Sequence, residues 1–407
     1  MNMNTTTHPL AFTPPADAPA AARTILRLLQ RLQVGTLDLQ MPDGSQARFG
    51  QGAPHGAIRL KDWSVCAAAL RSGDIGFAEA FIDGRWTSPD VVALLKVFLA
   101  NREAFESVIF GTWWGRALYR AKHLLNRNSR RGSRKNIHAH YDIGNPFYRL
   151  WLDETMNYSS ALFEGDLSRP TAEAQIAKVR RALREVQLQP GQRLLEIGCG
   201  WGALAEAAAG EVGASVVGVT LSDEQLAFAT ERMARHGLAE RVDLRLQDYR
   251  DIADAPFDAV VSIEMFEAVG REYWGDYFRT LHDKLVPGGL ACIQSITIRD
   301  DLFERYVKST DFIQQYIFPG GLLPSAEAFR AEARKAGLEV INELAFGGDY
   351  AETLRRWRAD FLARDGQVRQ LGFDTRFMRI WEFYLAYCEA AFATGNTNVV
   401  QFTLRRP

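Results

Sequence analysis

The sequence has few cysteines and no long apolar run, and both absences exclude classes of protein. Its 407 residues contain four cysteines that lie far apart with no C-x-x-C pair, so we expect free thiols in a reducing compartment and no metal site. No stretch reaches the ~18–20 apolar residues of a membrane-spanning helix, and the N-terminus lacks the apolar core of a signal peptide. These features predict a soluble, cytoplasmic protein whose contact with a membrane would be peripheral.

Acidic residues are absent from positions 107–141, although the whole chain has a formal net charge of only −1. This stretch instead mixes arginines and lysines with aromatic residues such as Trp113 and Trp114. A solvated linker between domains and a helix lying on an anionic membrane both fit the pattern, since tryptophans anchor at the interface while basic groups meet phosphates. A nucleic-acid surface fits less well, because no nucleic-acid-binding motif accompanies the basic run.

A short apolar run that breaks into glycines, residues 193–202, is the centre of the sequence pattern. Leu194 to Ile197 predict a buried parallel strand, the glycines at 198, 200 and 202 let the backbone approach a ligand, and a helix pattern follows. A second strand, residues 215–219, ends at Thr220, where a dinucleotide dehydrogenase would usually have an acidic residue. The order predicts the nucleotide-binding half of a doubly wound sheet and counts modestly against a nicotinamide cofactor.

Composition and periodicity divide the chain into four parts. Residues 1–20 are rich in Thr, Pro and Ala without periodicity, which predicts a disordered tail. Residues 21–105 predict a small α+β domain, whose hairpin turns at Pro42-Asp-Gly44. Residues 106–137 form the basic and aromatic linker, and residues 138–407 the domain that contains the glycine loop.

Several motifs, in order, resemble the cyclopropane-fatty-acyl-phospholipid synthases and their mycolic acid relatives. This resemblance implies an α/β fold, a Rossmann-like class I S-adenosylmethionine (SAM) methyltransferase sheet with a small N-terminal α+β domain. The motifs are His140-Tyr-Asp-Ile-Gly-Asn145, Met156-Asn-Tyr-Ser159, Leu195-Glu-Ile-Gly-Cys-Gly-Trp-Gly202, Gly218-Val-Thr-Leu-Ser222 with Gln225, Gln247-Asp-Tyr-Arg250, Met265-Phe-Glu267 with Val269-Gly270, Asp311-Phe-Ile313, Tyr316-Ile-Phe-Pro-Gly-Gly321, and Tyr350 with Thr353-Leu354.

The resemblance implies transfer of the SAM methyl carbon to the cis double bond of an unsaturated phospholipid acyl chain. Loss of a proton would then close a cyclopropane ring, and an aromatic face such as Phe266 or Tyr350 could stabilise the intermediate cation. In the family, a bound bicarbonate acts as the base. By position, Glu267 and Tyr350 match two of its ligands, and Ile296 matches an isoleucine that contacts the ion.

Two positions depart from the family pattern. Ser160 stands where the family has cysteine, and Gln294 where it has histidine. Both can donate hydrogen bonds to an anion, but glutamine cannot carry a positive charge. The ion or base is therefore open to a different arrangement, and an enzyme that makes methylene or methyl-branched acyl chains stays the alternative. A SAM- or lipid-binding protein without catalysis and a soluble small-molecule methyltransferase rank lower.

The resemblance also implies the cofactor site and the partners. We expect a homodimer on the inner face of the membrane that binds unsaturated phospholipid and no nucleic acid. Asp248, after the third strand, could accept a hydrogen bond from the adenine amino group. The residues expected to bind SAM are Tyr158, Ser159, Gly198, Gly200, Gly202, Thr220, Gln225, Gln247 and Asp248.

Overall fold

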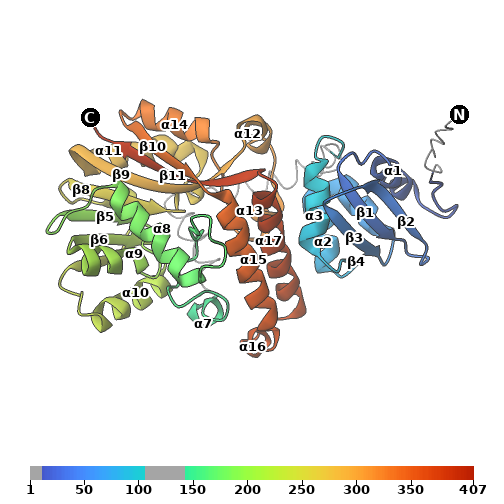
Figure 1. Ribbon diagram of the computed structural model, residues 1–407, viewed down its shortest axis with the longest axis horizontal. Helices are drawn as coiled ribbons and strands as arrows, with labels where there is room; N and C mark the ends of the chain where they lie inside the picture. Colours follow the sequence, from blue (N-terminus) through green and yellow to red (C-terminus); the bar gives the residue numbers. More distant parts are fainter. Residues whose placement is uncertain (1–11, 106–142) are drawn as a thin grey trace, which may run out of the picture. The chain divides into compact units, whose positions relative to one another are not determined.

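The computed structural model describes residues 12–105 and 143–407, and the chain divides into two units, residues 1–116 and 117–407 (Figure 1). The proposed linker 106–137 and residues 1–11 of the proposed tail lie outside the described residues. Residues 12–19 lie within the described part of unit 1, where the Phe12 ring packs edge-on against Phe49 with 5.2 Å between centroids.

The first unit is a small α+β domain around a four-stranded sheet with the order β2-β1-β3-β4. The predicted hairpin is present, because β1 and β2 pair antiparallel on either side of Pro42-Asp-Gly44. The sequence pattern predicts two helices, at 63–71 and 76–81, and α2 consists of two helical segments that meet at a kink, where Gly73 has a non-helical backbone (φ 62°, ψ −136°). The elements are α1 (Ala20–Leu29), β1 (Gly35–Gln40), β2 (Gln46–Gln51), β3 (His55–Leu60), α2 (Ser64–Ile82), β4 (Trp86–Thr87) and α3 (Val91–Ala100).

The second unit has a seven-stranded sheet with the order β10-β11-β9-β8-β5-β6-β7. The five strands from β9 to β7 run parallel, as the glycine-loop pattern predicts. The last strand, β11, was not expected from the sequence, and it lies antiparallel between β9 and β10. The strands are β5 (Arg193–Ile197), β6 (Ser215–Thr220), β7 (Val242–Leu246), β8 (Phe257–Ile263), β9 (Leu285–Ile298), β10 (Glu339–Ala345) and β11 (Thr397–Arg405).

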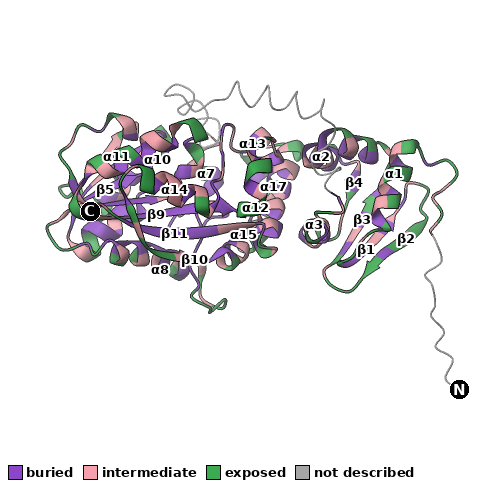
Figure 2. Ribbon diagram, turned by 90° about the horizontal axis from the view of Figure 1, so that it is seen from above, coloured by how far each residue is buried: buried purple, intermediate pink, exposed green. Residues whose placement is uncertain are grey.

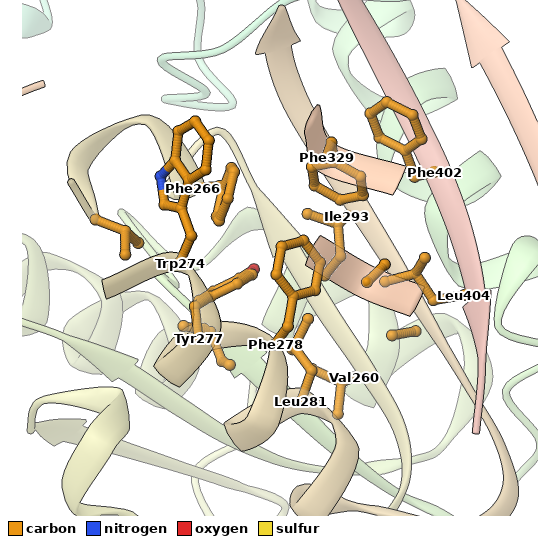
Figure 3. Close-up of a cluster of buried hydrophobic side chains, with 14 of the residues drawn as sticks. Val260, Phe266, Trp274, Tyr277, Phe278, Leu281, Ile293, Phe329, Phe402 and Leu404 are labelled. Carbon is orange, nitrogen blue, oxygen red and sulfur yellow. The ribbon is translucent and has the colours of Figure 1, made fainter. Parts of the chain in front are cut away.

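Helices cover both faces of this sheet, so β9 and β11 are mostly buried along their length (Figure 2). One face packs against aromatic side chains of α11 and α14, among them Phe278 and Phe329 (Figure 3). The other face packs against α8, α9 and α10 through smaller side chains such as Ala205 and Met233. The covering helices are α8 (Thr171–Glu185), α9 (Ala203–Ala207), α10 (Asp223–Arg235), α11 (Trp274–Lys284) and α14 (Ala326–Lys335).

Further helices surround the carboxyl ends of the strands. The aromatic-rich tail expected after Tyr350 forms two long helices, α15 and α17, that pack against each other. These helices bring residues from the end of the chain to the edge of the sheet where parallel strands end, the usual place of a ligand site. The remaining elements are α7 (Asn145–Tyr148), α12 (Asp300–Tyr306), α13 (Phe312–Tyr316), α15 (Gly347–Ala363), α16 (Asp365–Gln370) and α17 (Thr375–Ala393).

Candidate active site

A cavity lies at the carboxyl ends of the parallel strands of the second unit. Its walls come from the loops after β5, β6, β7 and β8, from the end of β9, and from the helices that surround them. Of the residues expected to bind SAM, all but Gly202 line it: Tyr158, Ser159, Gly198, Gly200, Thr220, Gln225, Gln247 and Asp248. Of the expected catalytic residues, Glu267, Ile296 and Tyr350 line it, whereas Ser160 and Gln294 do not.

Gly202 serves helix packing instead of lining the cavity. It begins α9 with φ +84°, and a Cβ atom there would lie 3.0 Å from the Ala229 Cβ atom of α10. Gly200, by contrast, lines the cavity and has no heavy atom within 4 Å of an added Cβ. The glycine pattern therefore combines two needs, close packing at 202 and open space for a ligand at 200.

These two glycines give a matched pair of variants. We expect Gly202→Ala to destabilise the protein by about 1–3 kcal/mol, because the methyl group both crowds α10 and strains the backbone. Gly200→Ala should cost less stability and weaken SAM binding instead. Thermal denaturation measures the loss of stability, and titration calorimetry with SAM measures the loss of affinity. A larger loss of stability in Gly200→Ala, or a larger loss of SAM affinity in Gly202→Ala, would contradict this account.

Glu196, the last residue but one of β5, is the strongest sign of a cationic ligand in the cavity. It is buried, its Oε2 atom has no hydrogen-bond partner, and burial raises the pKa of its carboxyl to about 8 although the backbone N–H of Ala205 donates to it. An orphaned buried carboxylate oxygen is costly unless a ligand satisfies it. The amino group of SAM is such a donor, so the residues present fit SAM.

The polar side chains on the neighbouring strand ends hold one another in place. The Thr220 hydroxyl donates to Gln225 Oε1 at 2.9 Å, and the Ser222 side chain caps α10 by accepting from the Gln225 N–H. The Asp248 carboxylate accepts two hydrogen bonds from the Arg250 guanidinium, at 2.8 and 2.6 Å. These contacts fix the orientation of the side chains at the ends of β6 and β7.

The segment before α8 is tied to the glycine loop by Asn145. An asparagine before Pro146 is typical of a helix N-cap, but here Asn145 is the first residue of α7 and Gly144 is the N-cap, without a side-chain hydrogen bond. The Asn145 amide instead donates to the Glu224 backbone carbonyl and carboxylate, both at 3.1 Å, and its Oδ1 accepts from Trp201 Nε1 at 2.6 Å.

Tyr158 and Ser159 are held over the cavity by buried polar contacts. The hydroxyls of Tyr158 and Tyr384 share a hydrogen bond of 2.7 Å. The Lys178 ammonium, which is fully buried on α8, donates to Ser159 Oγ at 2.5 Å, and burial lowers its pKa to about 8. The sequence offered no reason to place Lys178 in the site, because a lysine within a helix pattern is ordinarily exposed to solvent.

Two glutamates after β8 form the polar centre of the cavity. Glu264 Oε1 accepts from the Ser160 N–H at 2.9 Å and from Gln294 Nε2 at 2.7 Å, and its Oε2 accepts from the Tyr350 hydroxyl at 2.7 Å. Glu267 Oε1 accepts from the Ile296 N–H and from the Ser295 hydroxyl, while its Oε2 has no partner.

The structure shows how four of the candidate residues are placed. Ser160 contributes its backbone N–H, since its hydroxyl donates to the Ala161 carbonyl. Gln294 reaches the site only through Glu264, and Tyr350 likewise bonds to Glu264, not to Glu267. Phe266 does not line the cavity but lies in the aromatic core beside Trp274 (Figure 3). Aromatic residues of α15 and α17 that do line the cavity are Tyr350, Tyr384, Tyr387 and Phe392.

Burial dominates the acid–base properties of both glutamates. It raises the pKa of Glu264, although the three hydrogen-bond donors and the nearby Lys178 charge act to lower that pKa. It raises the pKa of Glu267 to about 8, and the Glu264 charge adds to this rise. Carboxyls whose pKa is higher in the folded than in the unfolded state stabilise the fold at low pH and lose that stabilisation as the pH rises toward 8.

A pH dependence of stability follows for the ligand-free protein. We expect Glu267→Gln, which is neutral at every pH, to gain thermal stability relative to the unsubstituted protein as the pH rises from 5 to 8.5. Calorimetric melting temperatures across that range measure the difference. A difference that stays constant with pH would mean that Glu267 titrates normally.

The rest of the cavity wall is mostly apolar and comes from α13, from the segment that follows it, and from α15 and α17. Many of the aromatic side chains after Tyr350 are buried in the core, including Trp357, Phe361 and Phe383. Some of its rings face the cavity, and Tyr350 and Phe392 lie 4.4 Å apart there. The apolar wall residues are Ile313, Phe318, Leu322, Leu323, Leu354, Tyr384, Tyr387, Ala391 and Phe392.

Among residues 12–105 and 143–407, no group of three or more His, Cys, Asp or Glu side chains is placed to hold a metal ion. The same residues include no helix that is long and apolar enough to cross a membrane.

Known proteins resemble this chain over most of its length. The family model "mycolic acid cyclopropane synthetase" matches residues 128–402. Tuberculostearic acid methyltransferase UfaA1 of Mycobacterium tuberculosis is 41% identical over 399 residues, which are 96% of this chain and 92% of that protein. Cyclopropane-fatty-acyl-phospholipid synthase of Escherichia coli K12 is 33% identical over 355 residues, with 87% and 89% covered. The crystal structure of mycolic acid cyclopropane synthase CmaA1 with SAH and CTAB superposes with a TM-score of 0.63 at 34% identity, over 67% of this chain and 98% of that one.

The parallel sheet, the glycine loop and the cavity at its strand ends define a class I methyltransferase. The similar proteins agree, so the protein is an enzyme whose methyl donor is SAM. More specifically, the chain belongs to the mycolic acid cyclopropane synthetase family, as its motifs suggested.

Proposed function

We propose that the protein transfers the methyl carbon of SAM to the cis double bond of an unsaturated phospholipid acyl chain and closes a cyclopropane ring. One observation carries this proposal. A single cavity joins the orphaned Glu196 carboxylate, the Glu264–Glu267 pair and an apolar aromatic wall. This combination suits a cationic methyl donor, a cationic intermediate and a hydrocarbon chain.

The reaction sets demands that these residues can meet. SAM supplies an electrophilic methyl group, and an alkene is a weak nucleophile, so chain and methyl must be held in line and water must be kept away from the cation. The Tyr350 ring faces the cavity and can stabilise positive charge. The carboxyl pair supplies negative charge and a base beside it.

A second product is favoured by one observation, the arrangement around Glu264. A 1,2-hydride shift before proton loss would give a methylene acyl chain, and this needs only a base in a different place. Glu264, three residues before Glu267, would provide such a base. The 41% identical relative is named for tuberculostearic acid, which is consistent with a product other than a cyclopropane.

The lipid partner and the location are further parts of this proposal. The Escherichia coli relative is named for phospholipids, and a phospholipid acyl chain would have to be reached at a membrane surface. We therefore propose peripheral binding at the inner face of the membrane, as a homodimer, without nucleic acid. Co-sedimentation with anionic vesicles and light scattering of the full chain test these points, and a monomer that ignores vesicles would contradict them.

Mass spectrometry of fatty acids tests the reaction itself. The protein is incubated with SAM and vesicles of cis-unsaturated phospholipid. A product 14 Da heavier that resists double-bond reagents but opens in acid supports the cyclopropane. A product 14 Da heavier that still reacts as an alkene supports the methylene acyl chain, and no product would refute both.

A further inference from the structure

Glu264 is held in a costly conformation at the centre of the site. Its backbone φ is +48°, in the left-handed region that side chains other than glycine rarely adopt. Such a conformation costs on the order of 1–3 kcal/mol and persists where the surroundings enforce it, often at functional sites. Here three donors converge on a buried carboxylate, the Ser160 N–H, the Gln294 amide and the Tyr350 hydroxyl.

The same donors were expected to hold a dissolved bicarbonate ion. All of them instead bind carboxylates of the protein: Ser160, Gln294 and Tyr350 donate to Glu264, and Ile296 donates to Glu267. A further anion would find these donors taken and two carboxyl groups beside it. The residues present therefore do not fit bicarbonate.

We propose that the Glu264 carboxylate is the built-in anion of this site, so that the protein needs no bicarbonate and Glu264 itself is the catalytic base. The inference rests on the proposed methyl transfer to a double bond. After that transfer, the C–H bond of the transferred methyl breaks, its electron pair forms the new carbon–carbon bond, and the proton moves to the Glu264 carboxylate. Glu264 then releases the proton to solvent before the next turnover.

Glu264 suits this role better than Glu267 because of its donors. Three hydrogen bonds from other residues and the nearby Lys178 charge favour its ionised form, whereas Glu267 lies beside the like charge of Glu264 and has one oxygen without a partner. The Glu264 carboxylate has the Lys178 ammonium as a charged neighbour, and burial together with the Glu264 charge raises the pKa of Glu267 to about 8.

Gln294 is positioned to keep Glu264 in place. Its Oε1 accepts from Gln401 Nε2 at 2.9 Å, which orients the amide so that its N–H points at Glu264. A neutral amide with one fixed donor suits a carboxylate that is part of the chain. The departure from histidine at this position is thereby explained.

Two substitutions separate the charge of Glu264 from the space that it fills. Glu264→Gln keeps the volume and removes the charge, whereas Glu264→Gly removes the side chain, relieves the positive φ and frees the three donors for a small anion. The full chain is assayed with SAM and cis-unsaturated phospholipid vesicles in carbonate-free buffer, with and without added bicarbonate. Binding of ¹³C-labelled bicarbonate is followed separately by NMR.

The expected pattern is specific. The unsubstituted protein should be equally active with and without bicarbonate and should show no saturable bicarbonate binding. Glu264→Gln should lose about 100-fold or more in rate under both conditions, in the range usual for loss of a general base. Glu264→Gly should be equally poor without bicarbonate but should bind the ion and recover at least about tenfold when it is added.

Several outcomes would overturn the inference. Stimulation of the unsubstituted protein by bicarbonate, or saturable binding of the ion to it, would show that Glu264 does not replace the anion. High activity of Glu264→Gln would show that Glu264 is not the base. If the unsubstituted protein makes no lipid product in either buffer, the proposed function fails, and the NMR comparison with Glu264→Gly still decides whether Glu264 occupies the anion site.

Discussion

A variant without either carboxylate, Glu264→Gln/Glu267→Gln, is expected to form at least about 1,000-fold less methylated lipid while still binding SAM. Both side chains keep their volume, so the cavity keeps its shape. The site, however, loses all negative charge beside the intermediate cation, and it loses both candidate bases. A base alone is commonly worth 10²–10⁴-fold in rate, and electrostatic stabilisation of the cation adds to it.

The losses of rate in the two single glutamine variants, expressed as free energies, should not add up to the loss in the double variant. Because the Glu264 charge acts directly on Glu267, the two carboxyls are coupled. Glu264→Gln alone should therefore already cost most of the rate, and adding Glu267→Gln should cost less than it does in the unsubstituted protein. Tyr350→Phe removes one donor to Glu264 and should cost only about tenfold, the value of one net hydrogen bond. Product formation is measured by mass spectrometry and SAM binding by calorimetry, for the unsubstituted protein, the two single glutamine variants, the double variant and Tyr350→Phe. Additive losses would mean that the two glutamates act separately.

The fold of the second unit could be predicted well because its determinants are local. The run of Leu194 and Leu195 before Gly198 sets a buried strand and a tight turn, and the same strand–loop alternation continues through β8. The position of β11 could not be predicted, because a strand that pairs antiparallel between β9 and β10 depends on partners more than 50 residues away. The break at Gly73 could be predicted because it is local: one glycine with a non-helical backbone separates the two helical segments of α2.

The sequence predicted several residues of the candidate site but not the hydrogen bonds between them. Motifs placed Tyr350, Glu267 and Ile296 at one cavity, as the structure has them. The sequence could not show that Glu264 accepts three hydrogen bonds. Its donors are the Ser160 N–H, Gln294 on β9 and Tyr350 on α15, which lie far apart in the chain and come together only in the folded protein. A signal was nevertheless present: two glutamates three residues apart directly follow a parallel strand, where ligand-binding groups gather.

Glu196→Gln is expected to weaken SAM binding about 100-fold, the largest effect on the cofactor side of the cavity. The carboxyl group is buried at the glycine loop, where a cationic ligand would favour its ionised form, and a charge-assisted hydrogen bond to the amino group of SAM would be worth about 2–3 kcal/mol. The amide has the size of the original side chain but cannot balance a positive charge. Its NH₂ group would also face the amino group of SAM, so that two donors would meet. Titration calorimetry with SAM measures the loss. Glu211→Gln is the matched control, because Glu211 is exposed, pairs with Arg180 at 2.8 Å, and should leave SAM affinity unchanged. Equal affinities for the two variants would place the amino group of SAM elsewhere, and the orphaned oxygen of Glu196 would then need another partner.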